Sequence, residues 1–201
     1  MSKNRYFNFN SSKAESQEQQ KEKLNELFTS KYIAQHFLKI ESLKDDLNRF
    51  PTKDEFFFLQ TAKAFNAFTF IPMICRIHRV KELHASTYGI SRKVVDALVE
   101  LHDKGMIEQV TLLVSDSMIK RNPIVIEHLK SLCASRKNIK VMYAWTHAKI
   151  CLLKTDDFDF VIEGSGNWSE NAHFEQYVFA NSKGLYDFRM SLFTSVDVLK
   201  Y

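Results

Sequence analysis

The chain has 201 residues and a formal net charge of +4, and 45% of its residues are hydrophobic, including 17 phenylalanines. This is enough apolar material for one buried core plus an appendage, which excludes a wholly disordered chain. The weak positive charge permits binding to nucleic acid or to anionic lipid headgroups and requires neither. The three cysteines are far apart and form no C-x-x-C pair, so the sequence indicates reduced thiols rather than a zinc site.

The first 50 residues differ in composition from the rest of the chain. Residues 1–23 are rich in Ser, Asn, Gln, Lys and Glu, and we expect them to be disordered. They lack the apolar segment of a signal peptide, and no stretch reaches the roughly 18 apolar residues of a membrane span. We therefore expect a cytoplasmic protein without stable membrane association. In residues 24–50 apolar residues recur every three or four positions, which predicts an amphipathic helical extension that ends before Pro51.

From residue 51 onward, short apolar runs alternate with stretches of helical periodicity. Ser91 is a suitable N-cap, and Gly105 a suitable terminator, for a helix between them. The expected strands are residues 55–60, 82–90, 110–114, 139–143, 147–153 and 160–162. The expected helices are residues 65–80, 92–104 and 123–133. This alternation predicts one layered α/β domain with a mixed sheet over residues 51–201.

The segments with the clearest chemical content are residues 146–153 and 163–169. On a strand alternate side chains share a face, so His147 and Lys149 are expected to point the same way. A hairpin that follows the strand would return Ser165 and Asn167 to a place beside them. An imidazole, an ammonium, a hydroxyl and an amide would then meet in one small volume.

These four groups suit nucleophilic attack on a phosphodiester. An imidazole is nucleophilic near neutral pH, and it can form a phosphoramidate that divides one difficult displacement into two easier ones. Lys149 and Asn167, together with Ser165, can stabilise the charge that gathers on the non-bridging oxygens. No acidic cluster suited to Mg²⁺ accompanies them. The sequence therefore predicts a phosphodiesterase without a metal or any other cofactor.

The spacing His147-x-Lys149, followed by Gly164-Ser165-x-Asn167, resembles the H-x-K … G-S-x-N signature of the phospholipase D superfamily. The resemblance implies a layered α-β-α domain. It also implies that the histidine is the nucleophile and that the lysine and asparagine bind phosphate. Members carry two such motifs, in one chain or in a dimer of single-motif chains. Because this chain has one copy, the resemblance implies a homodimer that shares one active site.

Three further positions belong to the same comparison. Residues 171–175 resemble the family segment that supplies a carboxylate to orient the histidine, which makes Glu175 the expected partner of His147. Lys154 stands where the family usually has an aspartate, and this departure puts the turn of the hairpin in question. Trp168, beside the expected phosphate ligands, is a candidate to stack on a nucleic acid base, although packing in the sheet is the favoured interpretation.

Short single-motif bacterial members of the superfamily are mostly nucleases, so the resemblance implies DNA or RNA as substrate. Two alternatives stay open. The first is a phospholipid phosphodiesterase or phosphatidyltransferase, which the missing membrane anchor disfavours. The second is a non-catalytic module that binds nucleic acid or a partner within a defence or mobile-element system. Retention of all four polar groups argues against a decayed site.

Overall fold

The computed structural model describes residues 47–195 apart from residues 48, 62–65 and 170–174. Our expectations for residues 1–23, and for most of residues 24–50, lie outside this part of the chain. Among the described residues, no helix has the length and apolar character needed to cross a lipid bilayer. The three cysteines are free thiols, two of them buried.

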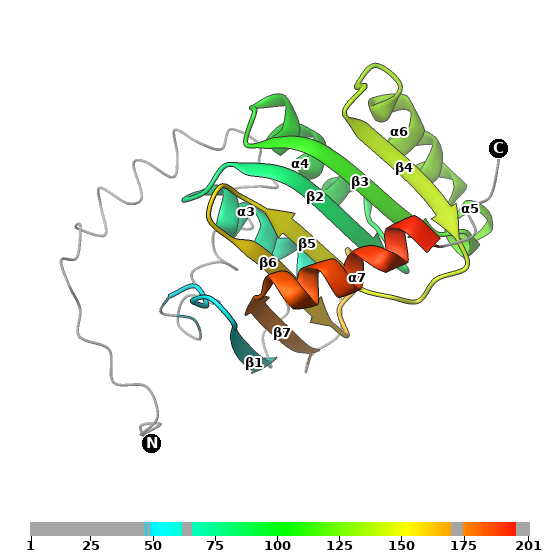
Figure 1. Ribbon diagram of the computed structural model, residues 1–201. Helices are drawn as coiled ribbons and strands as arrows, with labels where there is room; N and C mark the ends of the chain where they lie inside the picture. Colours follow the sequence, from blue (N-terminus) through cyan, green and yellow to red (C-terminus); the bar gives the residue numbers. More distant parts are fainter. Residues whose placement is uncertain (1–46, 48, 62–65, 170–174, 196–201) are drawn as a thin grey trace.

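A seven-stranded mixed sheet forms the centre of the domain, with the strand order β1-β7-β6-β5-β2-β3-β4 (Figure 1). Strands β2, β3 and β4 pair in parallel, whereas all other neighbours pair antiparallel. The strands are β1 (Glu55–Thr61), β2 (Val80–Thr87), β3 (Ile107–Ser115), β4 (Ile139–Ala144), β5 (Ile150–Lys154), β6 (Asp159–Gly164) and β7 (Glu175–Asn181). The predicted mixed sheet is confirmed.

Helices cover both faces of this sheet. They are α3 (Phe70–Cys75), α4 (Arg92–Asp103), α5 (Ser117–Arg121), α6 (Pro123–Cys133) and α7 (Lys183–Ser195), and a 3-10 turn (Ala67–Thr69) precedes α3. Helices α3, α4 and α6 lie across one face, and α7 lies across the other over β5 and β6 (Figure 1). Each face has its own apolar cluster, so the predicted α-β-α layering is confirmed.

Local sequence signals account for the ends of α4. The backbone N–H of Val94 donates to the Ser91 hydroxyl oxygen at 3.4 Å, which satisfies a donor that the first helical turn leaves unpaired. Gly105 follows the helix with a φ of +70°, in the left-handed region that glycine adopts without steric cost. The predicted start and stop of this helix are confirmed.

Most of the predicted strands differ from the observed ones by a few residues at their ends. The predicted helix over residues 65–80 is much shorter, because the amides of Ile77 and His78 both bond to the carbonyl of Ile74 and close the helix in a turn. Pro72 is the third residue of α3, where its missing N–H costs no helical hydrogen bond. The strand expected over residues 147–153 begins only at Ile150. The elements α5, β7 and α7 were not predicted at all.

Candidate active site

His147 lies in the connection between β4 and β5 rather than on a strand. The Ala148 amide bonds to the hydroxyl of Thr146 at 3.1 Å, and the Ser86 hydroxyl donates to the Ala148 carbonyl at 3.1 Å. At Ala148 these bonds to side chains stand in place of backbone pairing with a neighbouring strand. Strand β5 therefore begins only at Ile150. The backbone joins the sheet at Lys149, whose carbonyl accepts from the Gly164 amide at 3.3 Å.

His147 and Lys149 are brought together as the sequence predicts. The Lys149 Nζ atom is 3.0 Å from Nδ1 of His147 and 3.2 Å from its carbonyl oxygen. The imidazole is exposed and the lysine is half-buried. Burial lowers the pKa of the Lys149 ammonium, while the charge of Glu175 acts in the opposite direction. Glu175 is therefore close enough for its field to reach this pair.

Ser165 and Glu175 form a second group. The Ser165 hydroxyl donates to a carboxylate oxygen of Glu175 and accepts from the Gln176 amide at 3.1 Å. The Ser165 amide donates to the Gln176 carbonyl at 3.1 Å, so backbone pairing fixes the position of this serine. Within the described residues Glu175 bonds to Ser165 and makes no hydrogen bond to His147, so its role as the partner of His147 stays a prediction.

The turn after β2 contacts both halves of the predicted site. The ring of Tyr88 lies 4.4 Å from the ring of His147, centroid to centroid, and 5.8 Å from Lys149 Nζ. Gly89 faces the other half, because a Cβ atom added there would lie 3.8 Å from Cγ of Asn167. The Asn167 side chain is half-buried beside this turn. Sequence spacing gives no signal for Tyr88, because only the folded sheet brings it to His147.

Trp168, a candidate substrate-binding residue, is packed in the domain, which was the favoured interpretation of the sequence, and the stacking role is corrected. Its side chain is fully buried, and its indole packs edge-on against Phe68 with ring centroids 5.2 Å apart. Its amide bonds to the carbonyl of Gly89 at 2.9 Å and to the hydroxyl of Thr87 at 3.2 Å. Trp168 therefore anchors the Gly-Ser-x-Asn segment against the β2 turn and has no surface to offer a ligand. The exposed tryptophan is Trp145, two residues before His147, at 92% exposure.

The hairpin that carries Lys154 lies at the other end of β5. Lys154 is exposed and opposes Asp159, and the Thr155 hydroxyl accepts from the Phe158 amide at 3.0 Å to close the turn. Asp156 in this turn forms an ion pair with Lys81. The replacement of the usual aspartate by lysine therefore falls at the end of the strand away from His147.

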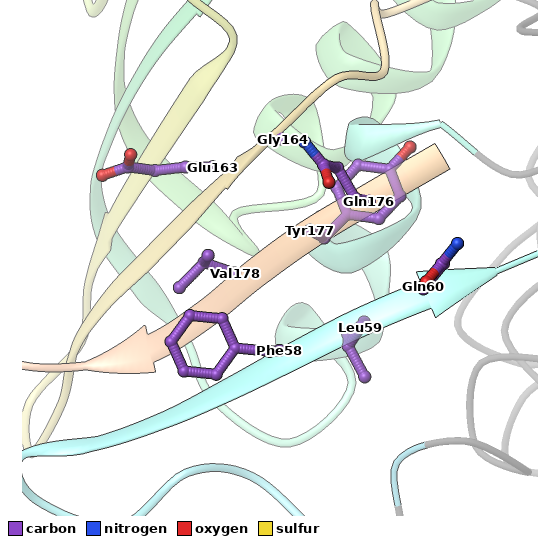
Figure 2. A pocket seen from close by; sticks show the side chains of 8 residues that line it. All are labelled: Phe58, Leu59, Gln60, Glu163, Gly164, Gln176, Tyr177 and Val178. Atoms are coloured by element: carbon purple, nitrogen blue, oxygen red, sulfur yellow. The ribbon is translucent and has the colours of Figure 1, made fainter. Parts of the chain in front are cut away.

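A surface groove runs from the Ser165 end of the site along the sheet. It encloses about 550 Å³, and Figure 2 shows its lining side chains on β1, β7 and the end of β6. The lining residues are Phe58, Leu59, Gln60, Glu163, Gly164, Gln176, Tyr177 and Val178. Among the described residues, no three His, Cys, Asp or Glu side chains cluster in a way that could hold a metal ion.

Comparison with known proteins bears on this arrangement. The family model described as "Cardiolipin synthase, PLD-like domain" matches residues 73–187, more than half of the chain. The chain belongs to the phospholipase D superfamily. The matched range contains His147, Lys149, Ser165, Asn167 and Glu175.

Two solved structures share the superfamily fold, each with a TM-score of 0.50 and 12% sequence identity. One is polyphosphate kinase from Porphyromonas gingivalis, for which the alignment covers 69% of this chain and 26% of that one. The other is phosphatidylserine synthase from Haemophilus influenzae Rd KW20, with 73% and 40% covered. At this identity the likeness shows the fold alone, and the chain spans less than half of either protein. None of the curated proteins matches the chain.

Proposed function

We propose that this chain is a metal-independent phosphodiesterase that hydrolyses DNA or RNA, with His147 as its covalent nucleophile. The observation that carries the proposal is the 3.0 Å approach of the Lys149 ammonium to His147 Nδ1 in an exposed connection. This contact supports the proposal, because an imidazole and an ammonium this close together can both reach one phosphate. Asn167 adds an amide on the far side of the Tyr88-Gly89 turn.

The chemistry proceeds in two displacements. Nε2 of His147 forms a bond to phosphorus while the bond from phosphorus to the leaving oxygen breaks, and that oxygen takes a proton from a general acid. Water then loses a proton to the same group and attacks phosphorus, and the phosphorus–nitrogen bond breaks. Lys149 and Asn167 stabilise the non-bridging oxygens in both steps, and the Ser165 hydroxyl joins them once it no longer donates to Glu175.

Substrate binding has to change the contact between Lys149 and His147. An ammonium only donates, so in the present arrangement Nδ1 of neutral His147 accepts and the ring proton resides on Nε2. Attack by Nε2 requires the other tautomer. An anionic phosphate is a better acceptor for Lys149 than a neutral ring nitrogen, so binding draws the ammonium away and leaves Nδ1 free to carry the proton. Glu175, whose charge already acts on Lys149, is the carboxylate that can then accept from Nδ1–H.

The general acid requires a second imidazole on the opposite side of phosphorus. An in-line displacement places nucleophile and acid on opposite faces, and one ring cannot occupy both. A two-fold symmetric dimer supplies the partner subunit's His147 in this role, because such an interface presents the same residues from each chain. We therefore propose that the active form is a homodimer with one shared site. Sedimentation of a fully active monomer at assay concentration would contradict this.

Nucleic acid is favoured as the substrate by the exposed Trp145 close to the nucleophile, since single-stranded bases stack on surface aromatic side chains. A phosphatidyl-transferring activity is the second candidate, because the matched family model is described as a cardiolipin synthase domain. The exposed Phe58 in the groove beside Ser165 is compatible with a lipid chain.

A substrate panel with and without a chelator tests the proposal. Purified protein is incubated with bis(p-nitrophenyl) phosphate, single-stranded DNA, RNA, plasmid and phosphatidylglycerol vesicles, each with excess EDTA and with Mg²⁺. We expect EDTA-resistant cleavage of the chromogenic diester and of nucleic acid, which His147→Ala abolishes. Activity that disappears in EDTA and returns with Mg²⁺ would refute the mechanism, and turnover of the vesicles alone would favour the phosphatidyl-transferring function.

A further inference from the structure

A second cation, Arg121 at the end of α5, contacts the tyrosine that lies against His147. The guanidinium carbon of Arg121, the last residue of that helix, lies 4.2 Å from the centroid of the Tyr88 ring, and its Nη2 donates to the Tyr88 carbonyl at 3.0 Å. The same ring contacts the His147 imidazole at 4.4 Å. Guanidinium and imidazole are therefore separated by no more than the sum of these two distances, with Tyr88 as the common contact.

Among the residues that the structure describes, no carboxylate forms an ion pair with Arg121. Within the described residues, four other arginines form ion pairs with acidic side chains, whereas the contacts of Arg121 are the ring and the carbonyl of Tyr88. The four pairs are Arg49–Glu55, Arg79–Glu108, Arg136–Asp103 and Arg189–Glu163. The Arg121 side chain is exposed, and a guanidinium has five N–H donors of which this geometry uses one. No group in the described part of the chain takes its remaining donors, so an anion from solvent can bind them.

We propose that Arg121 binds the phosphate adjacent to the scissile one, so that the site holds two successive phosphates of a nucleic acid strand. This deepens the function proposed above and rests on it. The upper limit that the two Tyr88 contacts set on the distance from His147 to Arg121 allows these side chains to contact neighbouring phosphates of one strand. A guanidinium fork suits the paired oxygens of a phosphate, and the Tyr88 contacts hold it in place at little further cost in entropy.

Substrates with one and with several phosphates distinguish this role from a purely structural one. Arg121→Gln should lower kcat/KM for a single-stranded oligonucleotide by about tenfold to a hundredfold, as expected for loss of a charge-assisted contact. It should leave hydrolysis of bis(p-nitrophenyl) phosphate within twofold of wild type, because that substrate has no neighbouring phosphate. Arg121→Lys should restore part of the oligonucleotide activity. An equal loss on both substrates would overturn the proposal and make Arg121 a positioning residue for Tyr88 and His147.

Binding measurements test the subsite without turnover. In a His147→Asn background, the affinity for the oligonucleotide is measured from low to high salt, with Arg79→Gln as a control that removes the same charge at the opposite end of β2. Arg121→Gln should make the slope of log affinity against log salt shallower by about 0.7 for each Arg121 in contact. Arg79→Gln should leave the slope unchanged. An unchanged slope in Arg121→Gln would overturn the proposal.

The activity assays and the binding measurements together distinguish a failure of this inference from a failure of the proposed function on which it rests. A wild-type protein that hydrolyses no diester would refute the proposed nuclease, while the salt slope would still report whether Arg121 contacts a nucleic acid phosphate. A nuclease whose Arg121→Gln variant keeps full oligonucleotide activity would refute the subsite alone.

Discussion

Gly164, the last residue of β6, precedes Ser165 and opposes Tyr177 on β7. A Cβ atom added at this glycine would lie 2.4 Å from the Gln176 carbonyl oxygen and 2.4 Å from Cδ1 of Tyr177. Both distances are far inside van der Waals contact, and one of the two atoms belongs to the backbone. Gly164→Ala therefore has to push β6 and β7 apart at the point where the Ser165 pairing begins.

Forcing one extra methyl group into a packed site costs about 1–3 kcal/mol of folding free energy. For a chain of this size each kcal/mol lowers the melting temperature by about 2–4 °C, so we expect Tm to fall by about 2–12 °C. The same displacement moves the Ser165 hydroxyl away from Glu175 and the Gln176 amide. We expect hydrolysis of bis(p-nitrophenyl) phosphate to fall at least tenfold, by the sensitivity of catalysis to misplacement on the order of 1 Å.

Two other glycines supply matched controls for the thermal melts and the activity assay. Gly184, near the start of α7, has no atom within 4 Å of an added Cβ, so Gly184→Ala should keep full activity and melt at the same temperature or higher. Gly105 also has open space around it but has a φ of +70°, so Gly105→Ala should cost about 1 kcal/mol and leave activity intact. A Gly164→Ala protein that melts and turns over like wild type would refute the close approach of the two strands.

Three further outcomes follow from the structure. Burial lowers the pKa of Lys149, so its charge opposes folding at any pH below its folded-state pKa. Lys149→Met should therefore melt no lower than wild type at pH 7, while its activity falls about 10²–10³-fold. A clear drop in Tm would contradict this. The Arg136 guanidinium lowers the pKa of Asp103 to about 2, so the stability from this exposed pair is present above the ordinary aspartate pKa and lost as the pH falls toward 2. Asp103→Asn should therefore lower the free energy of unfolding in urea by at most about 1 kcal/mol at pH 7, and by less at pH 2. An equal effect of the substitution at pH 7 and at pH 2 would argue against the pair. Trp168→Ala should destabilise the domain by about 3–5 kcal/mol, and a stable variant with a selective loss of oligonucleotide binding would restore the tryptophan as a ligand contact.

The sequence predicted those features whose signals are local. Ser91 and Gly105 bound α4 through backbone requirements that involve only neighbouring residues, and Pro123 begins α6 where its missing N–H is tolerated. The proximity of His147 and Lys149 follows from their spacing, although the connection is held by Thr146 and Ser86 rather than by a strand ladder.

Features that depend on distant pairing were missed or misassigned. Strand β7 lies beside β1, which is more than a hundred residues earlier in the chain, and α7 buries few of its side chains, so neither has a strong periodic pattern. The contacts of Tyr88 with His147 and Arg121 join two separate connections and the end of α5, which only the folded sheet brings together. The buried Trp168 packs against Phe68, which lies far from it in the sequence, so local patterns do not reveal the contact.

The central claim is that His147 becomes covalently bonded to phosphorus, and a rapid-quench labelling experiment tests it most directly. Enzyme in excess is mixed with a radiolabelled phosphodiester in EDTA and quenched into alkali, where phosphoramidates survive, before peptide mass spectrometry. Our account predicts a phosphorylated adduct on the peptide that contains His147, formed and lost at rates compatible with turnover and absent from His147→Asn. Complete turnover in EDTA without any adduct on this peptide, together with an active His147→Asn enzyme, would contradict it.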